Sequence, residues 1–401
     1  MRVLYGQAVY GEEEIAAATD VLRNSAIALM TGPKVAQFEH RIAGLFGKTH
    51  GLMTNSGSSA NLLALAALDL PKGSEVVTPA LTFATTVAPI LQLGLVPSFV
   101  DVAPASYVVE PEAVAAMIGP KTRALMIPNL IGNLPDWAGL RALADRHGLK
   151  VIEDSCDTLG ATVVGRPSGA FSDIATTSFY ASHVVTAAGF GGMVCVADEA
   201  LARRATLLRG WGRSSSLMGE SEDIDKRFAS QVDGIDYDSK FIFEGIGYNF
   251  LPSEIGAAFG LAQLDKLETF IGRRIANFAR LRAFFEAYED WFLLPRQRPE
   301  VRTGWLAFPL IVRDEAPFAR RDLQIHFERQ GIQTRTVFTG NILRQPGFKD
   351  ILRREAPAGY PNADRVMRGG LLIGCHQGLD TAAIDHITQT FVAFAAHKGR
   401  P

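Results

Sequence analysis

The sequence is poor in cysteine, with only three residues of this type, Cys156, Cys195 and Cys375, far apart along the chain. A disulfide framework needs a larger set at closer spacing, and a structural zinc site needs paired cysteines. Neither pattern is present. We therefore expect small thiols buried in the core, and no metal centre.

The sequence also lacks a long apolar run. Its one long uncharged stretch, between Glu75 and Asp101, is interrupted by prolines, threonines and Gln92. A membrane-spanning helix needs about 20 consecutive apolar residues. The N-terminal residues lack the apolar segment of a signal peptide. These absences predict a cytoplasmic protein with no membrane partner.

An excess of positive charge is missing as well. Lysine and arginine number 40 against 42 for aspartate and glutamate, and no basic run stands out. Proteins that bind nucleic acid concentrate positive charge on one surface, so we expect no nucleic acid partner. The 401 residues, 47% of them hydrophobic, suffice for one large domain or for a large domain plus a smaller one.

Helical and strand patterns alternate from about residue 35 to residue 200. The first helical pattern places Val35, Phe38, Ile42 and Leu45 on one face. Short apolar runs predict strands, and periodic segments between them predict helices. Such alternation indicates an α/β fold with a mainly parallel sheet between helices, whose ligands bind at the carboxyl ends of the strands. The expected strands are 74–79, 96–102, 122–129 and 150–156, and the expected helices are 58–70, 85–94, 111–119 and 137–148.

A long helical segment over residues 253–289 links this region to the remainder of the chain. After Pro295 the pattern changes to a strand, a helix and a further strand. This pattern predicts a smaller C-terminal α+β domain. We place the large domain at residues 1–274 and the small domain at residues 275–401.

Two segments carry polar residues where strands and helices meet. Gly57 and Ser58 stand just before a helix, where free amides and the helix dipole can hold a phosphate. The same residues also cap helices that bind no ligand. Glu153 and Asp154 follow a strand, and a carboxylate there can pair with a protonated pyridine nitrogen, bind a metal or cap a turn.

Two further segments are ambiguous when taken singly. Ser178 and His183 lie in a polar stretch that ends in glycines, which permit tight turns near a bulky ligand. A histidine alone is more often structural than catalytic. Asn249 precedes a helix whose start is marked by Pro252, Ser253 and Glu254, and its simplest interpretation is a turn or cap residue.

Taken together, the four segments resemble the nucleotide-sugar aminotransferase family of pyridoxal 5′-phosphate (PLP) enzymes, over about Tyr5 to Gln377. The resemblance implies the PLP-dependent aminotransferase fold type I, with a mainly parallel seven-stranded sheet, and a homodimer with shared active sites.

The resemblance also implies cofactor-binding roles for particular residues. A backbone turn and a serine bind the phosphate, an aromatic ring covers the cofactor, and an aspartate holds the pyridine nitrogen. A second carboxylate lies beside the cofactor, and an asparagine reaches the phosphate of the neighbouring subunit. In this order the residues are Gly57, Ser58, Ser178, Phe83, Asp154, Asp157 and Asn249.

One position departs from the aminotransferases of this family. They carry a lysine five residues after the serine that matches Ser178, whereas here that position is His183. No lysine occurs between Lys150 and Lys226. Imidazole cannot replace the covalent link that lysine makes to the cofactor, but it can move protons, since its ordinary pKa is about 6.5. The substitution resembles a subgroup of the family, the sugar 3-dehydratases.

The subgroup implies a dehydratase that uses PLP and pyridoxamine 5′-phosphate (PMP). It removes the C3 hydroxyl of a nucleotide-linked 4-keto-6-deoxyhexose, with His183 as the acid and base at the cofactor's C4′ carbon, Asp154 supporting it, and glutamate as amino donor. One branch of the subgroup holds an iron–sulfur cluster on cysteines in the segment matching residues 209–228. Here that segment has no cysteine, which favours the cluster-free branch.

Two alternatives stay open. A relative without its lysine could be a non-catalytic binding or regulatory protein, or the histidine could serve an elimination elsewhere on a different sugar. Leu251 stands where the family often has arginine, and residues 187–192 form a stretch one residue longer than usual. Both departures bear on the identity of the substrate.

Overall fold

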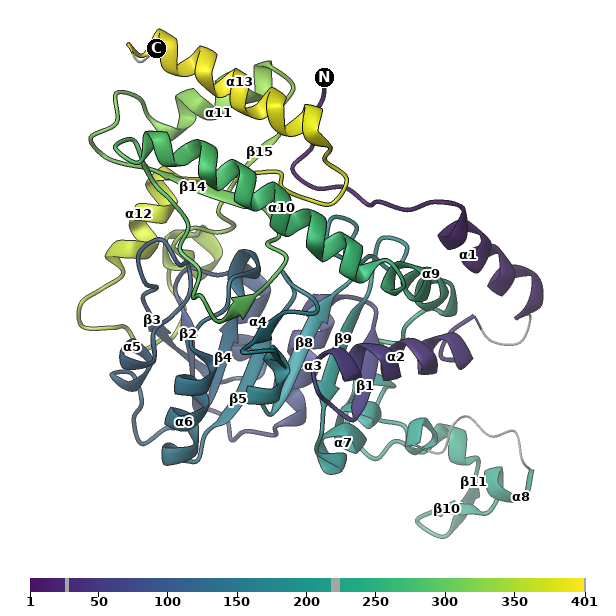
Figure 1. Ribbon diagram of the computed structural model, residues 1–401. Coiled ribbons are helices and arrows are strands. Elements are labelled where there is room, and N and C mark those ends of the chain that lie inside the picture. Colours follow the sequence, from purple (N-terminus) through teal and green to yellow (C-terminus); the bar gives the residue numbers. More distant parts are fainter. Residues whose placement is uncertain (26–28, 218–223, 400–401) are drawn as a thin grey trace.

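The computed structural model describes residues 1–25, 29–217 and 224–399 (Figure 1). Its centre is a seven-stranded sheet in which the strands from β8 to β3 run parallel and β9 is antiparallel to both of its neighbours. The prediction of a mainly parallel sheet is confirmed. In spatial order the strands are β1 (His50–Thr54), β9 (Gly192–Val196), β8 (Ile174–Ser178), β5 (Lys150–Asp154), β4 (Thr122–Pro128), β2 (Glu75–Pro79) and β3 (Val96–Val100).

Helices cover both faces of this sheet because its strands are apolar on both sides. In β9, Met193 packs in the same cluster as helix α2, whereas Val194 packs on the other side with helix α3. The predicted apolar face of α2 is buried at Val35, Phe38 and Ile42. The helices of this region are α1 (Glu12–Asn24), α2 (Pro33–Leu45), α3 (Gly57–Ala67), α4 (Ala84–Gln92), α5 (Pro111–Ala115), α6 (Trp137–His147), α7 (Glu199–Arg209) and α9 (Glu254–Leu264).

The predicted helical segment over residues 253–289 is two helices, because α9 ends at Leu264 and α10 covers Leu267–Phe285. A tertiary contact is found at the break. Lys266 lies between the helices, and its Nζ contacts both carboxylate oxygens of the buried Glu14 in α1 at 2.8 Å. Because α10 passes continuously through residues 274 and 275, the domain boundary stays a prediction.

The C-terminal part contains a four-stranded antiparallel sheet. Its order is β12 (Phe292–Leu293), β14 (Phe308–Val312), β16 (Gly370–Ile373) and β15 (Thr334–Thr336). The helices α11 (Arg320–Arg329), α12 (Pro361–Gly369) and α13 (Thr381–His397) accompany it. A small three-stranded sheet joins β13 (Val301–Arg302) to β6 (Thr162–Val163) and β7 (Arg166–Pro167).

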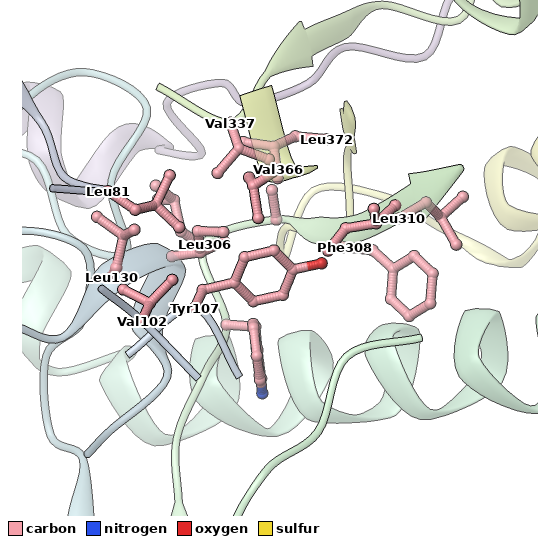
Figure 2. Packing of buried hydrophobic residues seen from close by; sticks show 14 of the residues in the cluster. Leu81, Val102, Tyr107, Leu130, Leu306, Phe308, Leu310, Val337, Val366 and Leu372 are labelled. Carbon is pink, nitrogen blue, oxygen red and sulfur yellow. The ribbon is translucent and has the colours of Figure 1, made fainter. Parts of the chain in front are cut away.

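One hydrophobic cluster joins the large sheet to the C-terminal sheet (Figure 2). Leu81 and Leu130 belong to loops of the large part, and Phe308 and Leu372 belong to the C-terminal strands. All four side chains are at most 1% exposed. The two parts therefore share a core, and residues of the C-terminal part can reach loops at the edge of the large sheet.

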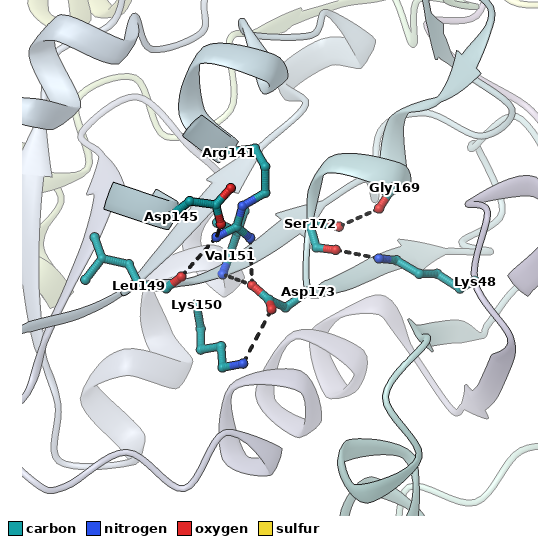
Figure 3. A network of polar contacts seen from close by, with 9 residues as sticks. All are labelled: Lys48, Arg141, Asp145, Leu149, Lys150, Val151, Gly169, Ser172 and Asp173. Carbon is teal, nitrogen blue, oxygen red and sulfur yellow. Dashed lines mark hydrogen bonds and ion pairs between the residues drawn. The ribbon is translucent and has the colours of Figure 1, made fainter. Parts of the chain in front are cut away.

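A polar network fixes the amino ends of β5 and β8 (Figure 3). Asp173, just before β8, accepts hydrogen bonds from the Val151 amide of β5 at 2.8 Å and from Arg141 of α6 at 2.9 Å. The two parallel strands are therefore held in register, so their carboxyl ends, at Asp154 and Ser178, lie together at the opposite edge.

Two further features complete the fold. A segment with α8 (Ile224–Arg227), β10 (Ser230–Val232) and β11 (Ile235–Tyr237) projects from the body (Figure 1). Among the helices described here, none is long and apolar enough to cross a membrane.

Candidate active site

A cavity of about 440 Å³ opens at the carboxyl ends of β5 and β8. Every residue predicted for the site lines it except Asn249. The residues brought together are Gly57, Ser58, Phe83, Asp154, Asp157, Ser178 and His183. Polar residues thus converge in a largely apolar cavity, which is the usual form of a cofactor or substrate site.

The start of helix α3 forms part of the cavity wall. The Ser56 side chain caps helix α3 by accepting from the Ser59 amide at 3.1 Å. No acceptor is found for the amides of Gly57 and Ser58 within the described part of the chain. These two free amides lie at the positive end of the helix dipole, where an anion is stabilised.

Glycine is required at position 57 by a close approach. A Cβ atom on Gly57 would lie 2.6 Å from the Cβ of Ser178 and 2.9 Å from the Sγ of Cys156. The missing side chain therefore lets the Ser178 hydroxyl stand beside the free amides. Two amides, a hydroxyl and the helix dipole together fit a phosphate group.

Asp154 lies deeper in the cavity and is 5% exposed. Its Oδ2 accepts hydrogen bonds of 2.8 Å from Asn61 Nδ2 and from Thr86 Oγ1, and its Oδ1 accepts from the Cys156 amide at 3.1 Å. Three donors orient the carboxylate. A carboxylate held in this way fits the protonated nitrogen of a pyridine ring.

The sequence analysis did not identify Asn61 and Thr86 as parts of the site. Their sequence context offered a signal, because both are polar residues within predicted helices that are otherwise mostly apolar. In the structure both side chains are 1% exposed. Buried polar side chains are almost always hydrogen-bonded, so a partner was to be expected. Which partner they meet depends on how the helices pack on the sheet.

His183 is half-buried in the loop between β8 and β9. Its Nδ1 lies 3.3 Å from the main-chain carbonyl oxygen of Ser178. A carbonyl only accepts, so this contact favours the tautomer with the proton on Nδ1 and leaves Nε2 free to accept a proton. Burial lowers the pKa of His183 to about 4, the Ser178 carbonyl opposes this shift, and the Arg274 guanidinium adds to it. The imidazole is therefore neutral at pH 7.

Asp157 is the second carboxylate of the cavity, and it accepts a hydrogen bond of 2.8 Å from the Ile131 amide. Burial raises the pKa of Asp157 to about 7, the Ile131 amide opposes the shift, and the charge of Asp154 adds to it. Ile131 has a φ of 59°, a strained value for a β-branched residue. The turn that orients Asp157 is thus held in place by its surroundings.

Aromatic rings form the mouth of the cavity. Phe83 is 51% exposed and lies 5.9 Å from the ring of Phe338, and Phe190 is 70% exposed. Tyr5, from the start of the chain, also lines the cavity, a position that no local pattern could reveal. A flat ring bound in the cavity would find an aromatic cover at Phe83.

Asn249 does not line the cavity of its own chain. Its backbone forms a bridge with Gly210, and its carbonyl oxygen accepts from Asn55 Nδ2 at 3.5 Å.

The cysteines do not form a cluster. Cys195 and Cys375 are buried as expected, but Cys156 is only half-buried and borders the cavity, because it follows Asp154 at the end of β5. Over residues 1–25, 29–217 and 224–399, no group of three histidine, cysteine or acidic side chains could hold a metal ion.

The cavity therefore offers a phosphate cradle, a carboxylate for a pyridine nitrogen and an aromatic cover, a set that fits PLP. A model of the DegT/DnrJ/EryC1/StrS aminotransferase family matches residues 9–392. The lipopolysaccharide biosynthesis protein RfbH of Salmonella typhimurium is 36% identical over 91% of this chain and 86% of its own length. The dTDP-4-dehydro-2,6-dideoxy-D-glucose 3-dehydratase of Saccharopolyspora spinosa is 35% identical over 97% of this chain and 86% of its own length.

The fold matches solved structures over nearly its full length. A crystal structure of GDP-4-keto-6-deoxymannose-3-dehydratase with a trapped PLP-glutamate geminal diamine superposes with a TM-score of 0.85. It is 26% identical, and the match covers 96% of this chain and 99% of that one. The prediction of the PLP-dependent aminotransferase fold is confirmed. This chain belongs to the DegT/DnrJ/EryC1/StrS aminotransferase family, whose members use PLP and act in deoxysugar biosynthesis.

Proposed function

We propose that this protein is a lyase that removes the C3 hydroxyl of a nucleotide-linked 4-keto-6-deoxyhexose with PMP as its working cofactor. One observation carries the proposal: among the residues that line the described cavity there is a histidine, His183, and no lysine. An aminotransferase of this kind needs a lysine amine to release its product and reload the cofactor. A dehydratase that moves protons with an imidazole needs no lysine amine.

Each residue of the cavity has a task in this proposal. When bound, the cofactor supplies an amine for the sugar ketone and a ring that withdraws electrons. The amides of Gly57 and Ser58 bind the phosphate with Ser178, and Asp154 holds the proton on the ring nitrogen. These contacts would hold the cofactor in the cavity that Phe83 and His183 both line.

His183 performs the proton transfers. Its Nε2 is the unprotonated atom in the favoured tautomer, so Nε2 takes the proton. The imidazolium that forms is acidic, because desolvation lowers the pKa of His183 to about 4. It therefore gives up its proton readily, and the C3 hydroxyl leaves as water after accepting it. The amine that joined the sugar would be released as ammonia when the product regains its C4 ketone. Glutamate would supply the next amine together with the two electrons gained by the sugar, and would leave as its 2-oxo acid.

A homodimer with shared sites is part of the proposal. The segment from residue 224 to residue 246 buries almost none of its large apolar side chains within its own chain, and a second copy is the occupant that we propose for it. Asn249, which does not line its own cavity, then serves the cofactor phosphate of the partner. The exposed apolar residues of the segment are Ile224, Phe228, Val232, Ile235, Tyr237, Phe241, Phe243 and Ile246.

The reaction proceeds in this proposal without an iron–sulfur cluster. Residues 209–228 contain no cysteine, and thiolates are the ligands that such a cluster needs. Residues 218–223 of this segment lie outside the described residues, so the argument rests on the sequence alone there.

The test is mass spectrometry of the products formed from a panel of nucleotide 4-keto-6-deoxy sugars, with PMP and glutamate present. The proposal predicts a product lighter than its substrate by one oxygen atom. A product that has gained an amino group would identify an aminotransferase. Cofactor binding without any product would indicate a non-catalytic binding protein. Loss of oxygen from another carbon would indicate a different elimination.

A further inference from the structure

The loop that carries His183 is attached to the C-terminal part of the chain by a buried glutamine. Gln377 lies between β16 and α13 and is 1% exposed. Its Nε2 donates a hydrogen bond of 3.2 Å to the carbonyl oxygen of Val184, the residue after His183. Gln377 does not line the cavity, so it contacts the loop that carries His183 without contacting the cavity.

Chemistry settles which end of the Gln377 amide faces the loop. Arg274 of α10 donates from Nε to the Oε1 of Gln377 at 2.7 Å. A guanidinium has donors only, so the amide oxygen must point to Arg274 and the amide nitrogen to Val184. In this orientation the amide oxygen of Gln377 accepts from Arg274 and its amide nitrogen donates to the Val184 carbonyl.

Arg274 is an unusual residue to find in a core. It is 0% exposed, and its Nη1 donates to the carbonyl oxygens of Trp305 and Leu306, each at 3.0 Å. In the described part of the chain no carboxylate forms an ion pair with it, and its Nη2 has no acceptor. A buried guanidinium without a counter-charge is costly, which points to a role besides stability.

The contacts of Arg274 lead to the cavity from two sides. Leu306 lines the cavity directly, and Gln377 leads to Val184 and so to His183. The imidazole is thus fixed twice. Its ring contacts the Ser178 carbonyl of the large sheet, and the carbonyl of the next residue, Val184, is held from the C-terminal part by Gln377.

We propose that Gln377, oriented by Arg274, is a positioning residue that holds His183 at the reacting carbon. The inference rests on the proposed function for its kinetic consequence, although the attachment of the loop can be measured without turnover. A catalytic group displaced by about 1 Å loses on the order of 100-fold in rate. The contacts from Arg274 through Gln377 to Val184 should therefore affect kcat rather than cofactor binding.

The decisive variant is Gln377→Glu. The new carboxylate still accepts from Arg274, and it pairs with that buried charge, but it presents an oxygen in place of the donor to Val184. We expect kcat to fall about 10- to 100-fold while KM and the Kd for PLP stay within about twofold. Gln377→Met removes both contacts and should lose at least as much kcat.

A matched control is available in Gln263 of α9. It is also 1% exposed, and its Nε2 donates to the main-chain carbonyl of Val9 at 2.9 Å, away from the cavity. Gln263→Met removes a buried amide of the same kind, so it should lower the unfolding midpoint without changing kcat. This comparison separates a positioning role from a loss of stability.

Hydrogen–deuterium exchange of the peptides that cover residues 179–191 gives a readout independent of activity. The amides of His183 and Ala187 are bonded within this loop, so they report on its order. We expect faster exchange in Gln377→Glu than in the parent and in Gln263→Met. Exchange and kcat equal to the parent in Gln377→Glu would overturn the inference. If the parent protein makes no product but Gln377→Glu still exchanges faster in this loop, the attachment of the loop by Gln377 is upheld and the proposed function is rejected.

Discussion

Asn61 of α3 donates a hydrogen bond of 2.8 Å to the carboxylate of Asp154 at the end of β5, although 93 residues separate the two in sequence. The helix that carries the free amides of Gly57 and Ser58 therefore also orients the carboxylate of Asp154 in the same cavity.

This relationship predicts the effect of Asp154→Asn. An amide cannot stabilise a protonated ring nitrogen as a carboxylate does, so the transition state should lose at least about 2 kcal/mol, or roughly 30-fold in kcat/KM. Circular dichroism should show an unchanged fold. Steady-state kinetics of the variant provide the measurement, with Asp145→Asn on the exposed side of α6 as the control. Near-normal turnover would mean that the cofactor ring lies elsewhere.

The absence of lysine from the described cavity lining predicts how the cofactor is attached. The protein should bind PLP without a covalent link, so borohydride treatment of the loaded protein should leave no cofactor on the chain. Intact-mass and peptide analysis check this outcome. A reduced lysyl adduct would return the protein to the aminotransferases.

The position of Asn249 outside its own cavity predicts complementation between subunits. An Asn249→Ala chain and a His183→Ala chain should each be nearly inactive. Their hybrid dimer has one site with both residues intact, so mixing with subunit exchange should restore part of the activity. Native mass spectrometry establishes the exchange. Hybrid dimers without activity would contradict shared sites.

The environment of His183 predicts the acidic limb of the pH profile. Burial lowers the pKa of its imidazole to about 4, so the neutral base persists above that pH and is lost as the pH falls through it. We expect kcat/KM to stay level from pH 7 to about pH 5 and to fall only near pH 4. Asp157, whose pKa burial raises to about 7, titrates at the neutral end of the same profile. The Asp157→Asn variant is therefore measured in parallel and should keep the acidic limb. A midpoint near 6.5 in both proteins would show an exposed histidine.

Much of the fold could be predicted because its signals are local. The spacing of Val35, Phe38 and Ile42 indicates a helix with one buried face, and the structure places these side chains in the core. Asp154 lies in a predicted strand, whereas Ser178 ends β8, whose sequence IATTS is too polar to stand out as a strand; parallel strands bring such ends to one edge of a sheet. Their convergence in the cavity follows from topology alone.

The parts that were missed depend on tertiary contacts. Asn61 and Thr86 become site residues only when α3 and α4 pack against β5. Lys266, between α9 and α10, pairs with Glu14 of α1, 252 residues earlier. Tyr5 reaches the cavity from the start of the chain. No periodicity along the sequence encodes such encounters.

The central claim is that the Nε2 of His183 moves the proton at the cofactor's C4′ carbon. The variant His183→Asn retains hydrogen-bonding capacity but cannot carry a proton at neutral pH. It should still bind cofactor and substrate, with turnover reduced by about 100- to 10,000-fold. The direct measurement is the washout of deuterium placed at C4′, with substrate present. We predict washout in the parent and retention of the label in His183→Asn, and washout of equal rate in both proteins would contradict the account.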